Sequence, residues 1–120
     1  MFAHDLHVAL AFASGAAMVV VAVEGAVRLV RASPPSRFAS GSMVGALFVV
    51  GMAAAAGLAM LVRGERPQEG LHYVYAVLAF GLVPTADSLA VRGTPRHRGL
   101  ARLLGALLSL GVILRLFATG

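Results

Sequence analysis

The feature that most constrains this chain is a series of long apolar segments that carry almost no charge. The clearest is MVGALFVVGMAAAAGLAMLV, residues 43–62, which contains no charged residue. A membrane-spanning helix needs about 20 predominantly apolar residues. Hydrophobic residues make up 59% of the 120-residue chain and charged residues only 12%, and so short a chain cannot bury that much apolar surface in a soluble core. We therefore expect most of its surface to face lipid.

Four apolar segments are recognisable, and we expect helices over about residues 5–30, 41–63, 70–92 and 99–118. They are separated by the short polar connections RASPPSR, RGERPQEG and RGTPRHRG. Proline cannot continue a helix, and short connections make successive helices antiparallel neighbours. The sequence therefore predicts an all-α fold, with residues 1–120 forming a single domain that is an integral membrane, antiparallel four-helix bundle.

The basic residues, all of them arginine, predict how the bundle is oriented. Cytoplasmic connections of membrane proteins carry an excess of basic residues. Seven of the ten arginines fall at the end of the bundle formed by the first and third connections, namely Arg28, Arg31, Arg37, Arg92, Arg96, Arg98 and Arg102. That end is predicted to be cytoplasmic, so the N-terminus and the C-terminus are both expected outside. The net charge of +5 is then explained by topology, and no nucleic-acid partner is expected.

Composition also indicates the compartment. The chain has no lysine and is rich in alanine, glycine and valine, which is typical of a GC-rich bacterial genome, so we expect a multi-pass protein of the bacterial inner (cytoplasmic) membrane. The start MFAHDLH lacks the positive region of a signal peptide, and we expect no cleavage there. The absence of cysteine excludes disulfides, thiolate metal sites and c-type haem attachment.

Polar side chains gather where the first and third helices begin, at the end that carries both termini. His4 and His7 are three residues apart and share a helix face, as do His72 and Tyr75. The two helices begin at the same end, so His7 and His72 are expected to face each other at similar depth. Imidazoles on facing helices commonly hold a haem iron or another metal. The alternative is that these rings only anchor the helices at the lipid headgroups.

Neighbouring charged groups extend this hypothesis. A carboxylate beside a metal-bound imidazole can accept its second N–H, and Asp5 and Glu69 are placed for that role. Arg115 lies only thirteen residues after Arg102, which puts it inside the hydrocarbon, at a cost of at least about 2.5 kcal/mol unless it is paired or reaches the headgroups. It is expected to snorkel outwards, to pair with Glu69 or Asp5, or to contact an anionic ligand such as a haem propionate.

The candidate site residues follow from these placements. The expected cofactor-binding residues are His7, His72, Tyr75 and Arg115. The expected ligand set for a metal ion is His4, His7, His72 and Glu69.

A second polar layer lies near the predicted cytoplasmic end. Glu24 and Arg28 are four residues apart, in the order that favours an ion pair on one helix. Asp87, five residues before Arg92, is expected to find water or an arginine. We expect a structural role for this layer; the alternative is that Glu24 and Asp87 lie on an ion pathway. Pro84 should kink the third helix.

Small residues along the second helix favour close helix contact. Gly41 and Gly45 are four residues apart, and the run AAAAG covers residues 53–57. Small residues at this spacing let helix backbones approach closely in membranes. We expect them to serve packing within the bundle, with formation of a homo-oligomer as the alternative.

The segments EGLHYVYAVLAF and HDLHVALAF resemble helix beginnings of four-helix membrane cytochromes and of one half of the haem A synthase fold, in which a Glu a few residues before a His opens a haem-binding helix. Here Glu69 precedes His72 by three residues, and the resemblance implies haem b with His7 as the opposing ligand. It covers two helix beginnings. The His-Arg pair usual in the family is absent, because Tyr73 follows His72.

Three functions remain open on the sequence. The first is a small haem-binding or respiratory-complex-associated subunit that transfers electrons and has its His site on the outer side. The second is a structural accessory subunit of a larger membrane complex, without a cofactor. The third is a small oligomeric transporter or channel that uses Glu24 and Asp87. No nucleophile–base pair or phosphate-binding loop is recognisable, so we expect no enzymatic activity beyond electron transfer.

Overall fold

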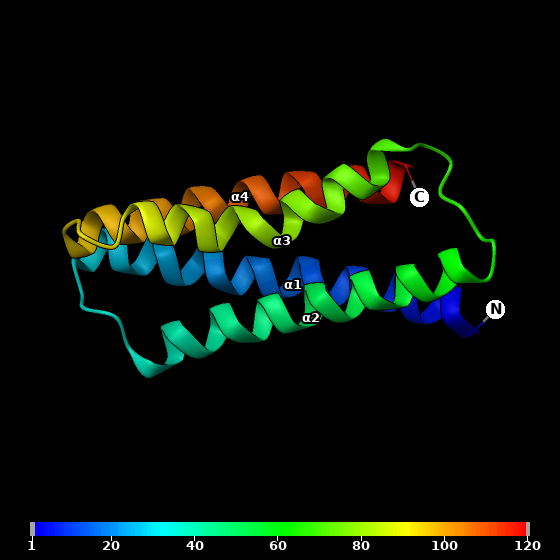
Figure 1. Ribbon diagram of the computed structural model, residues 1–120. Helices are drawn as coiled ribbons and strands as arrows, with labels where there is room; N and C mark the ends of the chain where they lie inside the picture. The colour runs from blue at the N-terminus through cyan, green and yellow to red at the C-terminus, as the bar shows by residue number, and fades with distance from the viewer. Residues whose placement is uncertain (1, 120) are drawn as a thin grey trace.

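A computed structural model describes residues 2–119 as four α-helices: α1 (Phe2–Arg31), α2 (Arg37–Val62), α3 (Leu71–Leu89) and α4 (Pro95–Thr119). No strand occurs within these residues. The helices run alternately up and down in an elongated bundle with principal extents of 48 × 23 × 19 Å. The start of α1, the α2–α3 connection and the end of α4 lie at one end (Figure 1). The all-α, four-helix architecture expected from the sequence is confirmed.

Caps explain why two helices begin about four residues earlier than expected. Ser36 precedes α2, and its Oγ accepts the Ala39 backbone N–H at 3.1 Å. Thr94 precedes α4, and its Oγ1 accepts the His97 backbone N–H at 3.3 Å. Pro95 then occupies the first position of α4, where its missing N–H would have no intrahelical partner anyway.

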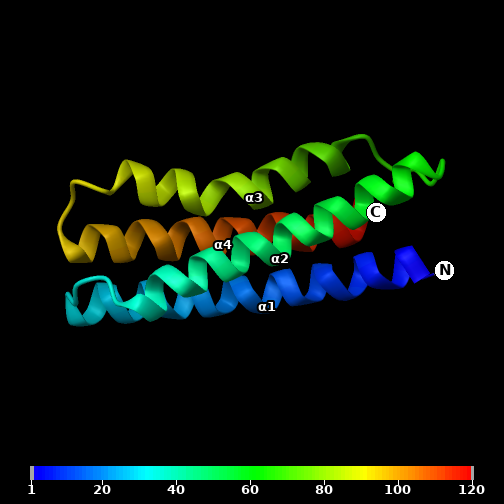
Figure 2. The same cartoon turned by 60° about the horizontal axis from the view of Figure 1, so that its bottom comes forward.

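Three of the helices, α1, α2 and α4, are long and apolar enough to cross a membrane. The third expected crossing, α3, is the shortest helix at 19 residues and is not among them. It carries His72 and Asp87 near its two ends and Pro84 within it. The helix continues through Pro84 and is bent along its length, as Figure 2 shows.

The four helices are not equally close to one another. Helix α1 packs against α2 and α4, α4 packs against α1 and α3, and α2 touches α3 only sparingly. Going round the bundle, the order is α2, α1, α4, α3, so α1 and α3 are diagonal (Figures 1 and 2). The buried core between them contains Met18, Val21, Val50, Val83 and Ile113.

Glycines let α1 and α4 meet backbone to backbone. A Cβ placed on Gly25 would lie 2.7 Å from the Leu103 backbone nitrogen, and one on Gly99 would lie 2.6 Å from that of Leu29. Side chains of any size at Gly25 or Gly99 would force the two helices apart. Close approach through small residues is how helices associate in lipid, where no hydrophobic force drives them together.

The glycines of α2 that the sequence singles out do not make such contacts. A Cβ on Gly41 or Gly45 would meet no atom within 4 Å. Instead α2 turns Ala39, Ala46 and Ala53 into the bundle. The expectation of close packing inside the bundle is therefore wrong for Gly41 and Gly45, because α2 is rotated so that they face outward.

Candidate functional site

Two histidines from diagonal helices meet at the end of the bundle where α1 and α3 begin. The imidazole rings of His7 and His72 have centroids 6.2 Å apart and planes inclined by 50°. Both side chains are partly buried. His7 Nδ1 lies 2.9 Å from the Ala53 carbonyl oxygen of α2, and His72 Nδ1 lies 3.3 Å from Thr119 Oγ1 of α4. All four helices therefore contribute to the surroundings of this histidine pair, His7 and His72.

The hydrogen-bond partners identify the protonated nitrogen of each neutral ring. The Ala53 carbonyl can only accept, so His7 Nδ1 donates to it. Thr119 Oγ1 donates its one hydrogen to the Arg115 carbonyl at 3.0 Å, so it accepts from His72 Nδ1. Each ring thus keeps Nε2 as the nitrogen with a lone pair. A metal-binding histidine usually has this arrangement, with its other N–H held by an oxygen acceptor.

Helix α2 provides the space that the His7 ring occupies. A Cβ on Gly57 would lie 3.1 Å from His7 Cε1 and 3.4 Å from His7 Nδ1. Gly57 and Ala53 are four residues apart and lie on one face of α2. Ala53 and Gly57, the first and last residues of the AAAAG run, therefore accommodate an imidazole instead of another helix backbone.

Tyr75 and Arg115 lie together one turn farther along the bundle. The Arg115 guanidinium carbon is 6.0 Å from the centroid of the Tyr75 ring, which is the range of a cation–π contact. Arg115 is exposed, and it forms no ion pair with Glu69 or Asp5.

The remaining expected ligands do not gather at the histidine pair. His4 and Asp5 are exposed on α1. Glu69 is also exposed, and its backbone N–H donates to the Thr119 carbonyl at 3.3 Å. Within residues 2–119 no group of three or more His, Cys, Asp or Glu side chains is close enough to hold a metal ion.

The donor set suits a haem better than a bare metal ion. A structural zinc site needs four protein ligands and a catalytic one three, whereas a haem needs only axial ligands from the protein. The pair offers two imidazole nitrogens. Their ring centroids are 6.2 Å apart. His7 and His72 are therefore the residues that would hold a haem iron at this end of the bundle.

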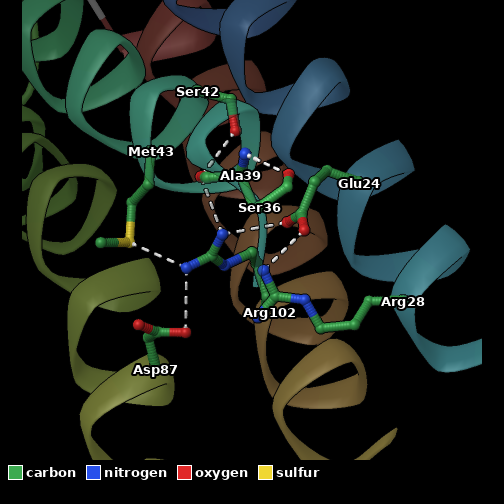
Figure 3. Close-up of polar contacts among 8 residues, drawn as sticks. All are labelled: Glu24, Arg28, Ser36, Ala39, Ser42, Met43, Asp87 and Arg102. Atoms are coloured by element: carbon green, nitrogen blue, oxygen red, sulfur yellow. Dashed lines mark hydrogen bonds and ion pairs between the residues drawn. The ribbon is translucent and has the colours of Figure 1, made fainter. Parts of the chain in front are cut away.

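At the opposite end, Arg102 of α4 connects the other three helices (Figure 3). Its Nη1 donates to Glu24 Oε2 of α1 at 3.0 Å and to the Ala39 carbonyl of α2 at 2.9 Å. Its Nη2 donates to Asp87 Oδ1 of α3 at 3.2 Å and lies 3.7 Å from the Met43 sulfur. One guanidinium thus ties together all four helices.

Arg28 completes this charge cluster of Glu24, Arg28, Asp87 and Arg102. Its Nη2 donates to Glu24 Oε1 at 2.7 Å, as the spacing of four residues predicts. Arg28 and Arg102 are 1% and 3% exposed, so both cations are buried. Two cations and two anions balance, which lowers the cost of placing them in an apolar bundle. Nε and Nη1 of Arg28 have no protein acceptor within the described residues.

Arg102 is the residue whose importance the sequence interpretation misses. It lies at the end of the bundle where the sequence places it, but its side chain is buried there among the other helices. The sequence contains the signal that was needed. Thr94 and Pro95 form a helix start, and a helix that begins there carries Arg102 two turns inside it.

Comparison with known proteins adds no relationship to this geometry. The chain matches no family model, no curated protein and no solved structure. The resemblance to membrane cytochromes and to haem A synthase therefore rests on the two helix beginnings alone, and the site must be interpreted from its own residues.

Proposed function

We propose that this protein crosses the membrane four times, with both termini outside, and binds haem b between His7 and His72 as a small electron-transfer subunit. The expected location is the bacterial inner membrane. In this proposal His7 and His72 would hold the haem iron, and Arg115 beside Tyr75 would supply a positive charge for the anionic groups of the cofactor. When bound, haem supplies one-electron redox chemistry.

Helix dimensions support the membrane placement. The bundle is 48 Å long, against about 40–45 Å for a bilayer with its headgroups. Helix α3 has 19 residues, which at about 1.5 Å per residue span about 28 Å, close to the hydrocarbon thickness of about 30 Å. It lies along α4, which is apolar and long enough to cross. A fourth crossing is therefore compatible with the length of α3.

The observation that carries the haem proposal is the convergence of two imidazoles from diagonal helices, each with Nδ1 held by an acceptor. The protein's own contribution is to fix both tautomers and to leave the two Nε2 lone pairs for a ligand. Gly57 of α2 lies against the His7 ring. Because Gly57 has no side chain, the ring can occupy this position.

The same hydrogen bonds also favour a second candidate, the accessory subunit without a cofactor. His7 joins α1 to α2, and His72 joins α3 to α4, so the pair can hold the end of the bundle together by itself. The transporter interpretation has less support, because Glu24 and Asp87 are both bound by arginine.

An absorption spectrum of the protein purified in mild detergent separates these functions. The haem proposal expects a Soret band that shifts on reduction and that is lost in both His7→Ala and His72→Ala. His97→Ala is the matched control, because His97 is exposed at the opposite end of the bundle and should keep the band. A colourless protein that also fails to bind added haem would refute the proposal and leave the accessory role.

A further inference from the structure

An apolar groove of about 720 Å³ runs along the outside of α3 and α4. Leucines form its flanks, among them Leu82 and Leu89 of α3 and Leu104 and Leu108 of α4. No Arg, Asp or Glu side chain lines it, and its one ionisable lining residue is His97 at the end nearest the α3–α4 connection. Its lining residues come from α3, α4 and the connection between them.

Small residues between the two helices create this groove. Gly81 and Ala86 of α3 and Ala101 and Gly105 of α4 all line it. A Cβ on Gly105 would lie 3.1 Å from Ala86 Cβ, so the helices are close together there, whereas a Cβ on Gly81 would meet nothing within 4 Å. Because no bulky side chain stands between the flanking leucines, a trough stays open to the surroundings of the bundle.

The length of the groove matches one leaflet of a bilayer. On α3 its lining extends from Leu89, the last residue of the helix, to Val77. Twelve residues of helix rise about 18 Å, and the hydrocarbon of one leaflet is half of about 30 Å. The groove therefore starts at the end of the bundle that carries the α3–α4 connection and ends near the middle of the membrane.

Basic residues lie close in sequence to the residues that line this end of the groove. Residues 90–101 contain Arg92, Arg96, His97 and Arg98, and no Asp or Glu. Arg92, Arg96 and His97 are exposed. His97 Nδ1 lies 3.1 Å from Thr94 Oγ1, which holds the ring at the mouth. Basic pockets between membrane helices bind the headgroups of anionic lipids.

We propose that this groove binds one anionic phospholipid. The phosphate lies on Arg92, Arg96 and His97, and one acyl chain lies along the trough between α3 and α4. The proposal rests on the membrane placement proposed above and is independent of the haem. Charge at the mouth selects the headgroup, and the apolar trough selects a chain that reaches the middle of the bilayer.

Native mass spectrometry tests the headgroup contact. Delipidated protein in a mild detergent is mixed with phosphatidylglycerol or with phosphatidylcholine of the same acyl chains. Wild-type protein should retain one phosphatidylglycerol in preference to phosphatidylcholine. A basic residue near an anionic surface contributes about 1 kcal/mol, or roughly fivefold in affinity, so Arg92→Gln/Arg96→Gln should weaken retention about 25-fold. The matched control is Arg63→Gln/Arg66→Gln, which removes the same charge at the opposite end and should leave retention unchanged.

A second pair of variants tests the acyl-chain contact. Gly81→Leu places a side chain in the groove at a position where its Cβ would meet nothing within 4 Å, and should abolish retention of phosphatidylglycerol. Gly111→Leu adds the same side chain on α4, at a position that is also open and does not line the groove. This variant should retain the lipid. Equal retention in these two variants, or equal retention of the two lipids by wild type, overturns the proposal.

Three further measurements identify the source of the anion and keep this result separate from the proposals above. Inorganic phosphate at millimolar concentration should not displace the lipid; displacement would show a site for a free anion and overturn the proposal. Loss of the protein from membranes on alkaline carbonate washing would refute the membrane placement itself. The Soret band of the same samples reports on haem, and its absence leaves the lipid result unaffected.

Discussion

Replacing Arg102 by methionine tests whether the charge cluster holds the bundle together. Methionine keeps much of the length of the side chain and removes its charge and its donors. Arg102 is the only partner of Asp87 among the ion pairs of the described residues, whereas Glu24 keeps Arg28 at 2.7 Å. The variant therefore leaves Asp87 as the uncompensated charge, in a side chain that is 18% exposed.

The expected loss of unfolding free energy is about 3–5 kcal/mol, which is the usual effect of removing one partner from a buried ion pair. This magnitude is expected because the Arg102 side chain is 4% exposed and the Asp87 side chain 18%, so water screens little of the interaction. Adding Asp87→Asn to Arg102→Met removes the unpaired charge. The two substitutions should therefore be non-additive, with a coupling energy of about 1–3 kcal/mol.

Unfolding by sodium dodecyl sulfate in mixed micelles, followed by far-ultraviolet circular dichroism, measures both quantities. Arg92→Met is the control, because Arg92 is exposed and its replacement should change the free energy by no more than about 0.5 kcal/mol. An Arg102→Met protein within 1 kcal/mol of wild type, or strict additivity with Asp87→Asn, would show that the ion pairs do not contribute as argued.

Two glycine substitutions test the close contacts, with Gly111 as the common control because a Cβ there meets nothing within 4 Å. Gly99→Ala places a Cβ 2.6 Å from the Leu29 backbone nitrogen and should destabilise the bundle by about 1–3 kcal/mol in the same detergent titration. Gly111→Ala should be neutral or stabilising. Equal stability of the two variants would contradict the contact. Gly57→Val should displace the His7 ring, which a Cβ approaches to 3.1 Å, and should weaken the Soret band predicted for the haem-loaded protein, while Gly111→Val leaves it intact. An unchanged band in Gly57→Val would show that the position of His7 against α2 is unimportant.

Positions along the bundle axis were predictable from the sequence. The approximate helix positions follow from long apolar runs and Pro-rich or Gly-rich connections, and they place His7 and His72 at one level. The structure brings these two rings together. The Glu24–Arg28 pair likewise depends only on a spacing of four residues within one helix.

Rotation about each helix axis was not predictable. When a helix is apolar all round, hydrophobicity does not mark the face that turns inward. Gly41 and Gly45 thus looked suited to close packing and face open space, while Gly25 and Gly99 make the close contact. Arg102 illustrates the same difficulty, because its place inside the bundle depends on the exact start of α4 and on the facing residues of three other helices.

The cluster around Arg102 also has a consequence for biogenesis. Asp87 leaves the ribosome before Arg102, so a nascent chain that has released only its first three helices holds an acidic side chain without its counterion. Charge neutrality and the backbone contact between α1 and α4 are both completed by the fourth helix. The bundle is therefore completed only when the fourth helix is present, and a polypeptide truncated before residue 95 would keep Asp87 without its arginine.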